Sequence, residues 1–173
     1  WDRLMPVQSR TIPYILAGRD LMVQSRTGSG KTGAFLLPIL ERIDPDKASP
    51  QALILTPTRE LALQVAREGQ MLAGDSPIRG VTLYGGVGYE KQLEGLRQGS
   101  HIVVGTPGRI LDHLMRRTLR LGDLQILVFD EADRLLSMGF YPDMRQLARW
   151  LPKRRSGFMF SATFPAPVRA LAR

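Results

Sequence analysis

Six short apolar runs, each followed by a longer stretch with helical spacing, constrain the fold of this chain more than any other feature. Most of the runs are continuously apolar, which is typical of strands buried on both faces of a parallel sheet. They predict strands at 21–24, 53–56, 81–84, 102–105, 126–130 and 158–161. Helices are predicted at 31–43, 59–72, 89–98, 108–115, 142–150 and 166–172. Strand and helix in repeated alternation predict an α/β domain with a doubly wound, mainly parallel sheet flanked by helices.

Length and composition agree with a single domain over residues 1–173. Hydrophobic residues make up 43% and charged residues 23%, and the sequence contains neither a linker nor an internal repeat. Pro38 lies within the helix predicted at 31–43 and should kink or shorten it. Because cysteine is absent, disulfides and thiolate metal sites are excluded. This absence is compatible with a reducing cytoplasm, and we expect a cytoplasmic protein.

The chain is basic, with 24 Lys and Arg against 16 Asp and Glu and a net charge of +8. Such an excess attracts polyanions and would steer nucleic acid toward the surface, although a soluble domain can also simply be basic. The charges are spread along the chain and locate no binding face. No run approaches the roughly 18 apolar residues of a membrane span, so we expect no membrane association. The chain does not begin with Met, and we expect it to be part of a longer protein.

Polar segments follow the predicted strands at the point where each strand ends. In an open parallel sheet, ligands bind beyond the carboxyl ends of the strands. We therefore expect one crevice to collect the segments that begin at Ser25, Pro57, Gly85, Thr106, Asp130 and Ser161.

A glycine-rich loop lies between the strand at 21–24 and the following helix. Backbone N–H groups in such a loop close around phosphate oxygens, and the helix presents its positive end to them. Lys31 would reach the β- and γ-phosphates of ATP, and the Thr32 hydroxyl would bind Mg²⁺. The usual pattern begins with Gly, where this chain has the small residue Ser25. The predicted ATP-binding residues of this loop are Arg26, Thr27, Gly28, Ser29, Gly30, Lys31 and Thr32.

Two carboxylates end the apolar run at 126–130. Asp130 at the strand tip would hold Mg²⁺, partly through water, and Glu131 could accept a proton from the water that attacks the γ-phosphate. Alone, these acids could equally be solvated charges at the start of a helix. The phosphate loop in the same chain favours the catalytic interpretation. We therefore predict Glu131, Lys31 and Asp130 as catalytic residues.

Residues 130–133 read Asp-Glu-Ala-Asp, and with this motif the chain resembles the N-terminal RecA-like domain of the DEAD-box ATP-dependent RNA helicases. Further motifs of the family follow the same order from Pro6 to Thr163. The resemblance implies a RecA-like P-loop NTPase fold, ATP and Mg²⁺ as cofactors, and RNA as a partner. Members of the family also carry a second RecA-like domain with arginine fingers. Residues 1–173 offer no sequence for it, so we expect little activity from this domain alone.

The resemblance also implies roles for individual residues. Gln8 would bind the adenine edge, although read alone a Gln at the start of a helix would be a surface residue. Thr58 and Pro107 would in addition be good helix caps in any α/β protein. Coupling of the ATP site to strand separation is implied for Asp133, Ser161 and Thr163. Contacts to RNA phosphates and sugars, which read no base sequence, are implied for Pro57, Thr58, Arg59, Gly85, Gly86, Thr106, Pro107, Gly108 and Arg109.

The histidines and several methionines are expected to be structural. His101 and His113 have no partners at metal-ligand spacing and should be structural or exposed. Met115, Met138 and Met144 fall in helical patterns and should pack.

Two alternative functions stay open. One alternative is the P-loop ATPase domain of a DNA translocase or protein remodeller. The other is a nucleic-acid-binding module with a vestigial nucleotide site.

Overall fold

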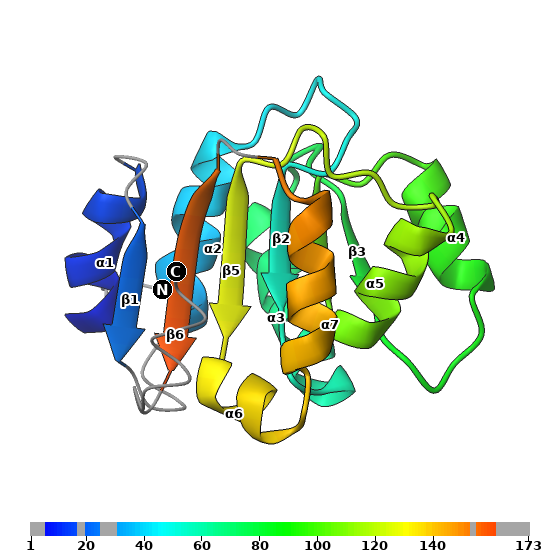
Figure 1. The fold of residues 1–173 in the computed structure, drawn as a ribbon. Helices are drawn as coiled ribbons and strands as arrows, with labels where there is room; N and C mark the ends of the chain where they lie inside the picture. Colours follow the sequence, from blue (N-terminus) through cyan, green and yellow to red (C-terminus); the bar gives the residue numbers. More distant parts are fainter. Residues whose placement is uncertain (1–5, 17–19, 25–30, 153–154, 162–173) are drawn as a thin grey trace.

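The structure is a computed structural model that describes residues 6–16, 20–24, 31–152 and 155–161, and its centre is a parallel sheet of six strands (Figure 1). The order across the sheet is β1-β6-β5-β2-β4-β3, and every neighbouring pair is parallel. All six predicted strands are confirmed, three of them with the predicted bounds. The strands are β1 (Leu21–Gln24), β2 (Ala52–Leu55), β3 (Gly80–Leu83), β4 (Ile102–Gly105), β5 (Ile126–Asp130) and β6 (Ser156–Ser161).

Helices connect the strands and cover both faces of the sheet (Figure 1). Five of the six predicted helices are confirmed, and the sixth, at 166–172, lies outside the described residues. α2 continues past Pro38 to Arg42, so this proline does not end the helix. None of the described helices is long and apolar enough to cross a membrane. The helices are α1 (Pro6–Leu16), α2 (Lys31–Arg42), α3 (Arg59–Ala73), α4 (Glu90–Arg97), α5 (Pro107–Met115), α6 (Ala132–Ser137) and α7 (Tyr141–Leu147), the last followed by a 3-10 turn, η1 (Ala148–Trp150).

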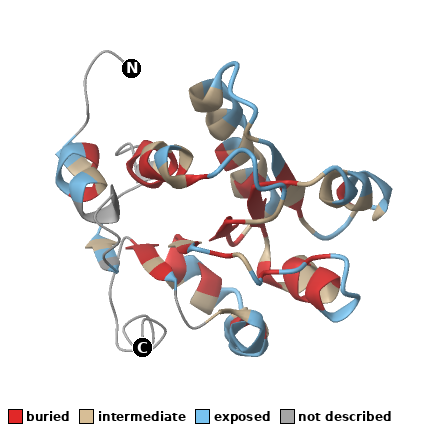
Figure 2. Cartoon of the chain, turned by 90° about the horizontal axis from the view of Figure 1, so that it is seen from above, coloured by how far each residue is buried: buried red, intermediate tan, exposed pale blue. Residues whose placement is uncertain are grey.

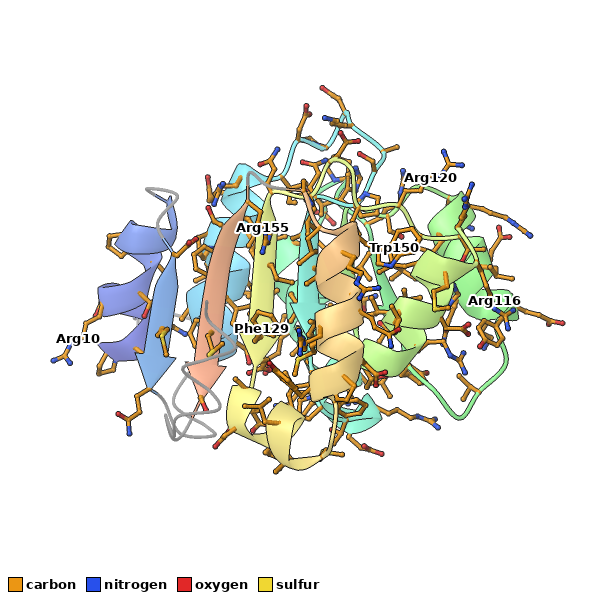
Figure 3. The ribbon with its side chains drawn as sticks, viewed as in Figure 1. Arg10, Arg116, Arg120, Phe129, Trp150 and Arg155 are labelled. Atoms are coloured by element: carbon orange, nitrogen blue, oxygen red, sulfur yellow. The ribbon has the colours of Figure 1, made fainter. Side chains whose placement is uncertain are left out.

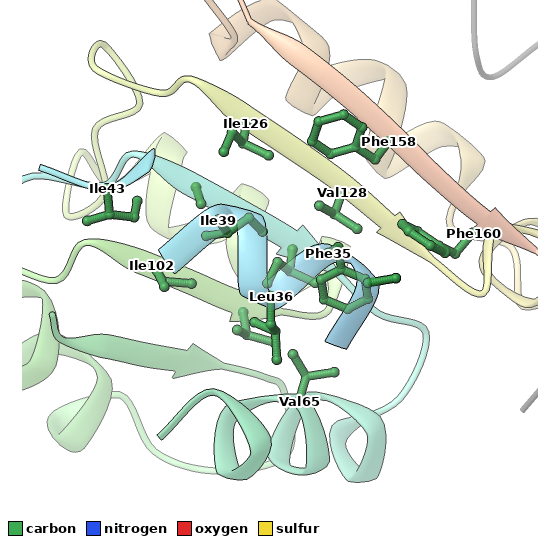
Figure 4. Close-up of a cluster of buried hydrophobic side chains, with 14 of the residues drawn as sticks. Phe35, Leu36, Ile39, Ile43, Val65, Ile102, Ile126, Val128, Phe158 and Phe160 are labelled. Atoms are coloured by element: carbon green, nitrogen blue, oxygen red, sulfur yellow. The ribbon is translucent and has the colours of Figure 1, made fainter. Parts of the chain in front are cut away.

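The sheet is buried on both faces, with one hydrophobic cluster on each side (Figure 2). Ile54 of β2 belongs to the cluster with α2 and α3, whereas Leu53 and Leu55 belong to the cluster with α5 and α7. Within the first cluster, the rings of Phe35 and Phe160 lie 5.2 Å apart (Figure 4). Burial on both faces explains why the strands read as continuous apolar runs rather than alternating ones.

Two of the three methionines expected to pack do not. Met144 of α7 is buried in the second cluster, as predicted. Met115 and Met138 were expected to do the same, but they are 63% and 49% exposed. Each lies at the end of a helix, where the pattern of apolar spacing no longer decides which side chain faces the sheet.

Candidate functional site

All six strands end at one edge of the sheet, the lower edge in Figure 1, and the strand order divides the predicted site residues there into two groups. β1, β6 and β5 are neighbours, and the segments predicted for ATP, Mg²⁺ and coupling follow them. β2, β4 and β3 are neighbours, and the segments predicted for RNA follow them. Because β5 pairs with β2, the two groups adjoin at the middle of the sheet.

The first group includes the start of α2 and a buried glutamine. Lys31 is the first residue of α2, and Thr32 follows in the first turn, where its side chain is half-buried. Gln8 is fully buried in α1, which packs against α2, so the interpretation of Gln8 as a surface residue is wrong. The side chain of Lys31 lies outside the described residues, as do Arg26, Thr27, Gly28, Ser29 and Gly30.

Glu131 follows β5 in an uncommon backbone conformation. Asp130 is the last residue of β5 and is 1% exposed, and Glu131 is 8% exposed. Glu131 has φ 52° and ψ 57°, in the left-handed region that few residues other than glycine adopt. Its Oε2 atom accepts a hydrogen bond of 3.0 Å from Nη1 of Arg134. Strained backbone of this kind persists where the surrounding structure imposes it and is frequent at active sites.

The oxygen donors of this group fit a magnesium ion. Mg²⁺ prefers oxygen ligands and is commonly held by one or two carboxylates together with water and substrate phosphates. The Asp130 carboxylate and the Thr32 hydroxyl are ligands of that kind, and a buried carboxylate is favoured by a nearby cation. Within the described ranges, no group of three or more His, Asp or Glu residues could hold a metal by itself. A magnesium site that is completed by the phosphates of a nucleotide does not require such a group of three residues.

Two of the three predicted coupling residues come together. The Asp133 backbone N–H donates to Oγ of Ser161 over 3.2 Å and so links α6 to the end of β6. Oδ1 of Asp133 accepts a hydrogen bond from the backbone N–H of Arg134 over 3.0 Å. Thr163 lies outside the described residues.

In the second group, two helix N-termini meet the edge of the sheet. Oγ1 of Thr58 accepts from the backbone N–H of Leu61 over 3.2 Å and caps α3. Pro107 occupies the first turn of α5, after Thr106. Both capping expectations are therefore confirmed. A helix N-terminus is favourable for an anion, so a capping role and a phosphate contact are compatible at these positions.

Tyrosines support both arginines that were predicted to contact RNA. The guanidinium carbon of Arg59 lies 5.0 Å from the centre of the Tyr84 ring, and that of Arg109 lies 4.0 Å from the Tyr89 ring. Arg59 is exposed, but Arg109 also donates from Nη2 to the Val87 carbonyl oxygen over 3.0 Å. Arg109 therefore holds the loop after β3, next to the two exposed residues Gly85 and Gly86.

A buried polar network contacts the guanidinium of Arg109. Nε2 of Gln92 donates to the Tyr84 carbonyl oxygen over 2.9 Å, while its Oε1 atom accepts from Nη1 of Arg109 over 3.2 Å. Nε2 of His113 lies 2.9 Å from the same Oε1 atom. Burial, reinforced by the positive charge of Arg109, lowers the pKa of His113 and favours its neutral form. This histidine is therefore structural, as predicted.

Some residues of the site carried no signal in the motif analysis. Tyr89, Gln92 and Arg134 act through contacts to motif residues and belong to no motif that we identified. For Arg134 a signal exists, since a cation three residues after Glu131 on a helix is correctly spaced for an ion pair. For Gln92 there is none, because its partners lie up to 21 residues away in the sequence.

Comparison with known proteins connects this geometry to a family. A family model described as DEAD/DEAH box helicase matches residues 5–171. The chain belongs to the DEAD/DEAH box helicase family. Its match to the family model includes both groups at the sheet edge, from Gln8 to Ser161.

Relatives within the DEAD/DEAH box family are similar over nearly the whole chain. The ATP-dependent RNA helicase CshA of Listeria monocytogenes is 46% identical over 171 residues, which are 99% of this chain and 33% of that protein. The ATP-dependent RNA helicase DeaD of Haemophilus influenzae is 48% identical over 169 residues, 97% of this chain and 28% of that protein. The chain thus spans about a third of the length of these curated relatives.

A solved structure agrees with the same assignment. The crystal structure of a DEAD box protein from the hyperthermophile Methanococcus jannaschii superposes with a TM-score of 0.93 at 41% sequence identity. The superposition covers 97% of this chain and 46% of the other. The fold is therefore the RecA-like α/β domain that the sequence predicts.

Proposed function

We propose that this chain is the ATP-binding domain of an ATP-dependent RNA helicase. In this proposal it binds ATP with Mg²⁺ and the RNA backbone, and a second RecA-like domain is required before hydrolysis drives duplex unwinding. The observation that supports the proposal is the strand order. The residues predicted for the nucleotide follow β1, β6 and β5, the residues predicted for RNA follow β2, β4 and β3, and the two sets of strands adjoin where β5 pairs with β2. Neighbouring sites on one rigid sheet suit an enzyme in which each ligand affects the other.

On the nucleotide side, each residue has a distinct task. Lys31 and the N-terminus of α2 would bind the phosphates, Thr32 and Asp130 would hold Mg²⁺, and Gln8 would bind the adenine. Bound Mg²⁺ would neutralise charge on the terminal phosphates. Glu131 would take the proton of the attacking water, and Arg134 would keep its carboxylate in place through their 3.0 Å ion pair.

On the RNA side, the described residues offer groups that suit phosphates and not bases. The capped N-terminus of α3, the start of α5 and the exposed Arg59 present positive charge or free N–H groups along one edge. Gly85 and Gly86 leave room for a backbone to approach, and Gly86 has a φ of 83° that favours glycine. Binding of this kind would be independent of RNA sequence.

The named relatives favour RNA over DNA as the substrate. CshA and DeaD are both named as ATP-dependent RNA helicases, which supports the main proposal and not the DNA translocase or protein remodeller. A cytoplasmic location stays a prediction from the absence of cysteine.

RNA-stimulated ATP hydrolysis tests the proposed function. We would compare residues 1–173 with the longer protein that contains them, each with and without single-stranded RNA. We expect ATP binding by both proteins, and RNA-stimulated hydrolysis by the longer one only. The proposal fails if RNA does not stimulate hydrolysis by the longer protein, or if DNA stimulates it equally.

A further inference from the structure

A shallow groove lies between α5 and α7, away from the edge that carries the proposed ATP and RNA sites. We name it the α5–α7 groove, and it has a volume of about 340 Å³. Both helices start at the carboxyl edge of the sheet, and Met115 ends α5, about 13 Å from its start at 1.5 Å per residue. Phe129 lies near the carboxyl end of β5, and Figure 3 shows Trp150 farther from that edge of the sheet than Phe129 is. The groove is lined by Leu111, Met115, Gln146, Arg149 and Trp150.

Three of the five side chains that line the groove are apolar. Met115 is 63% exposed and Trp150 is 42% exposed, and both are among the largest exposed hydrophobic side chains in the described part of the chain. Trp, Met and Arg are the residue types enriched in protein–protein interfaces, and Trp and Arg dominate their energetic hot spots. Methionine also adapts its shape to different partners. The composition is that of a binding surface rather than of a solvated helix face.

The chain segments that contain the lining residues are strongly basic. Residues 111–120 and 141–151 contain five arginines and two aspartates. One aspartate, Asp112, is already engaged, because it pairs with Arg116 over 3.2 Å and accepts a hydrogen bond from Tyr89. The other arginines, all exposed, are Arg117, Arg120, Arg145 and Arg149.

We propose that the α5–α7 groove binds an acidic segment of a partner protein, with one apolar side chain against Trp150 and Met115 and carboxylates beside the arginines. Arg149 both lines the groove and carries one of the positive charges that would attract a carboxylate. Arginine suits carboxylates particularly well, because its planar guanidinium donates two parallel hydrogen bonds.

RNA is the competing occupant, and the groove fits it less well. The groove lies on the flank of the domain, whereas the phosphate-binding groups Thr58, Arg59 and Thr106 follow the carboxyl ends of their strands. Leu111 and Met115 offer no hydrogen bond to a base edge. An apolar anchor of a peptide would fill the space that they line.

A display experiment can test the proposal without knowing the partner. A random peptide library would be selected on the protein, and the enriched peptides would be synthesised with a fluorescent label for anisotropy measurements. We expect the enriched sequences to place Asp or Glu around an aromatic or large aliphatic residue. Their binding should weaken about thirtyfold in Trp150→Ala, as for loss of an interface hot spot, and should weaken in Arg149→Glu. Added salt should weaken it further.

Matched variants and a second probe decide the outcome. Arg10→Glu makes the same charge change at an exposed position of α1, at the opposite end of the sheet from Trp150 in Figure 3, and should leave peptide binding unchanged. If Trp150→Ala lowers the melting temperature, its loss of peptide binding could come from unfolding. The exposed variant Arg149→Glu then decides whether the groove binds the peptides. The proposal is overturned if the enriched peptides are not acidic, or if both groove variants bind them within about twofold of the parent. It is also overturned if the groove variants lose affinity for labelled single-stranded RNA but not for the peptides.

Discussion

Glu131 joins β5 to α6 through a left-handed backbone conformation, and Arg134 holds its carboxylate. The sequence predicts Glu131 as the catalytic base from its place after an apolar run, together with the phosphate loop in the same chain. It does not predict the conformation, because nothing in the local sequence demands a positive φ from a glutamate. The two hydrogen bonds from Arg134 and Leu135 N–H groups to the Glu131 carbonyl oxygen, both of 3.0 Å, show that the start of α6 fixes this geometry.

At the same scale, Lys31→Ala should nearly abolish ATP binding, because Lys31 is the cation that the motif places at the terminal phosphates. A titration with a fluorescent ATP or ADP analogue in the presence of Mg²⁺ would measure the loss. Arg42→Ala, at the other end of α2, serves as the control for removing a positive charge. Unchanged affinity in Lys31→Ala would refute the assignment of the phosphate loop.

Glu131→Gln separates binding from chemistry. The amide keeps the size of the side chain but cannot take a proton, so ATP affinity should persist while hydrolysis by the longer protein falls by about 10²–10⁴. Binding and turnover would be measured on the same preparation. Turnover within about twofold of the parent would exclude Glu131 as the base.

Arg134 offers a test of positioning rather than chemistry. Arg134→Ala removes the ion pair to Glu131, so we expect kcat of the longer protein to fall about tenfold with little change in KM, since small misplacements of a catalytic group are costly. Arg134→Lys keeps the charge and should recover part of the loss. If the alanine variant changes KM and leaves kcat unaltered, Arg134 acts on ATP binding and does not position Glu131.

Secondary-structure elements were more predictable than their ends. Strands buried on both faces gave continuous apolar runs, so all six were found. α6 was not predicted as a separate helix, because its six residues are too few to establish a helical period. Pro38 does not end α2, because the buried face of that helix, with Phe35 and Ile39, stabilises it beyond the proline.

A close approach between β3 and β4 yields a prediction about stability. A Cβ atom at Gly105 would lie 2.1 Å from the Leu83 carbonyl oxygen, so Gly105→Ala must push two paired strands apart. We expect a loss of about 1–3 kcal/mol in the free energy of unfolding, measured by urea denaturation. Gly122→Ala is the matched control, because nothing lies within 4 Å of the added Cβ. Equal stability of the two variants would contradict the packing described here.

For the molecule as a whole, the sequence predicts which segments reach the edge of the sheet but not their order across it. Strand order depends on which strands pair, and the apolar runs are too alike to specify that. The observed order places β5 beside β2 and so brings the residues predicted for the nucleotide next to the residues predicted for RNA. The contacts of Arg109 to Gln92 and Val87 were equally hidden, since they depend on residues 17 and 22 positions away.

These contacts sharpen what RNA binding by the domain should look like. In the proposed function this domain supplies only one part of the RNA-binding surface, so we expect weak, sequence-independent binding that falls steeply with added salt, as counterion release requires. Arg59 is exposed, and Arg59→Ala should reduce the slope of log affinity against log salt concentration by about 1, as for the loss of one phosphate contact. Arg109→Ala should cost more affinity for the same change in slope, because it also frees the loop at Val87 from its anchor.

Fluorescence anisotropy with labelled single-stranded RNA and DNA, at several salt concentrations, would measure both effects. The double variant Arg59→Ala with Arg109→Ala should weaken binding uniformly across RNA sequences, and a preference for RNA over matched DNA would indicate contact with the 2′-hydroxyl. Arg10→Ala, an exposed position on α1, controls for loss of net charge. If the double variant keeps the affinity and the salt slope of the parent, both arginines are structural, held by Tyr84 and Tyr89. The RNA would then have to bind elsewhere on the basic surface of the domain.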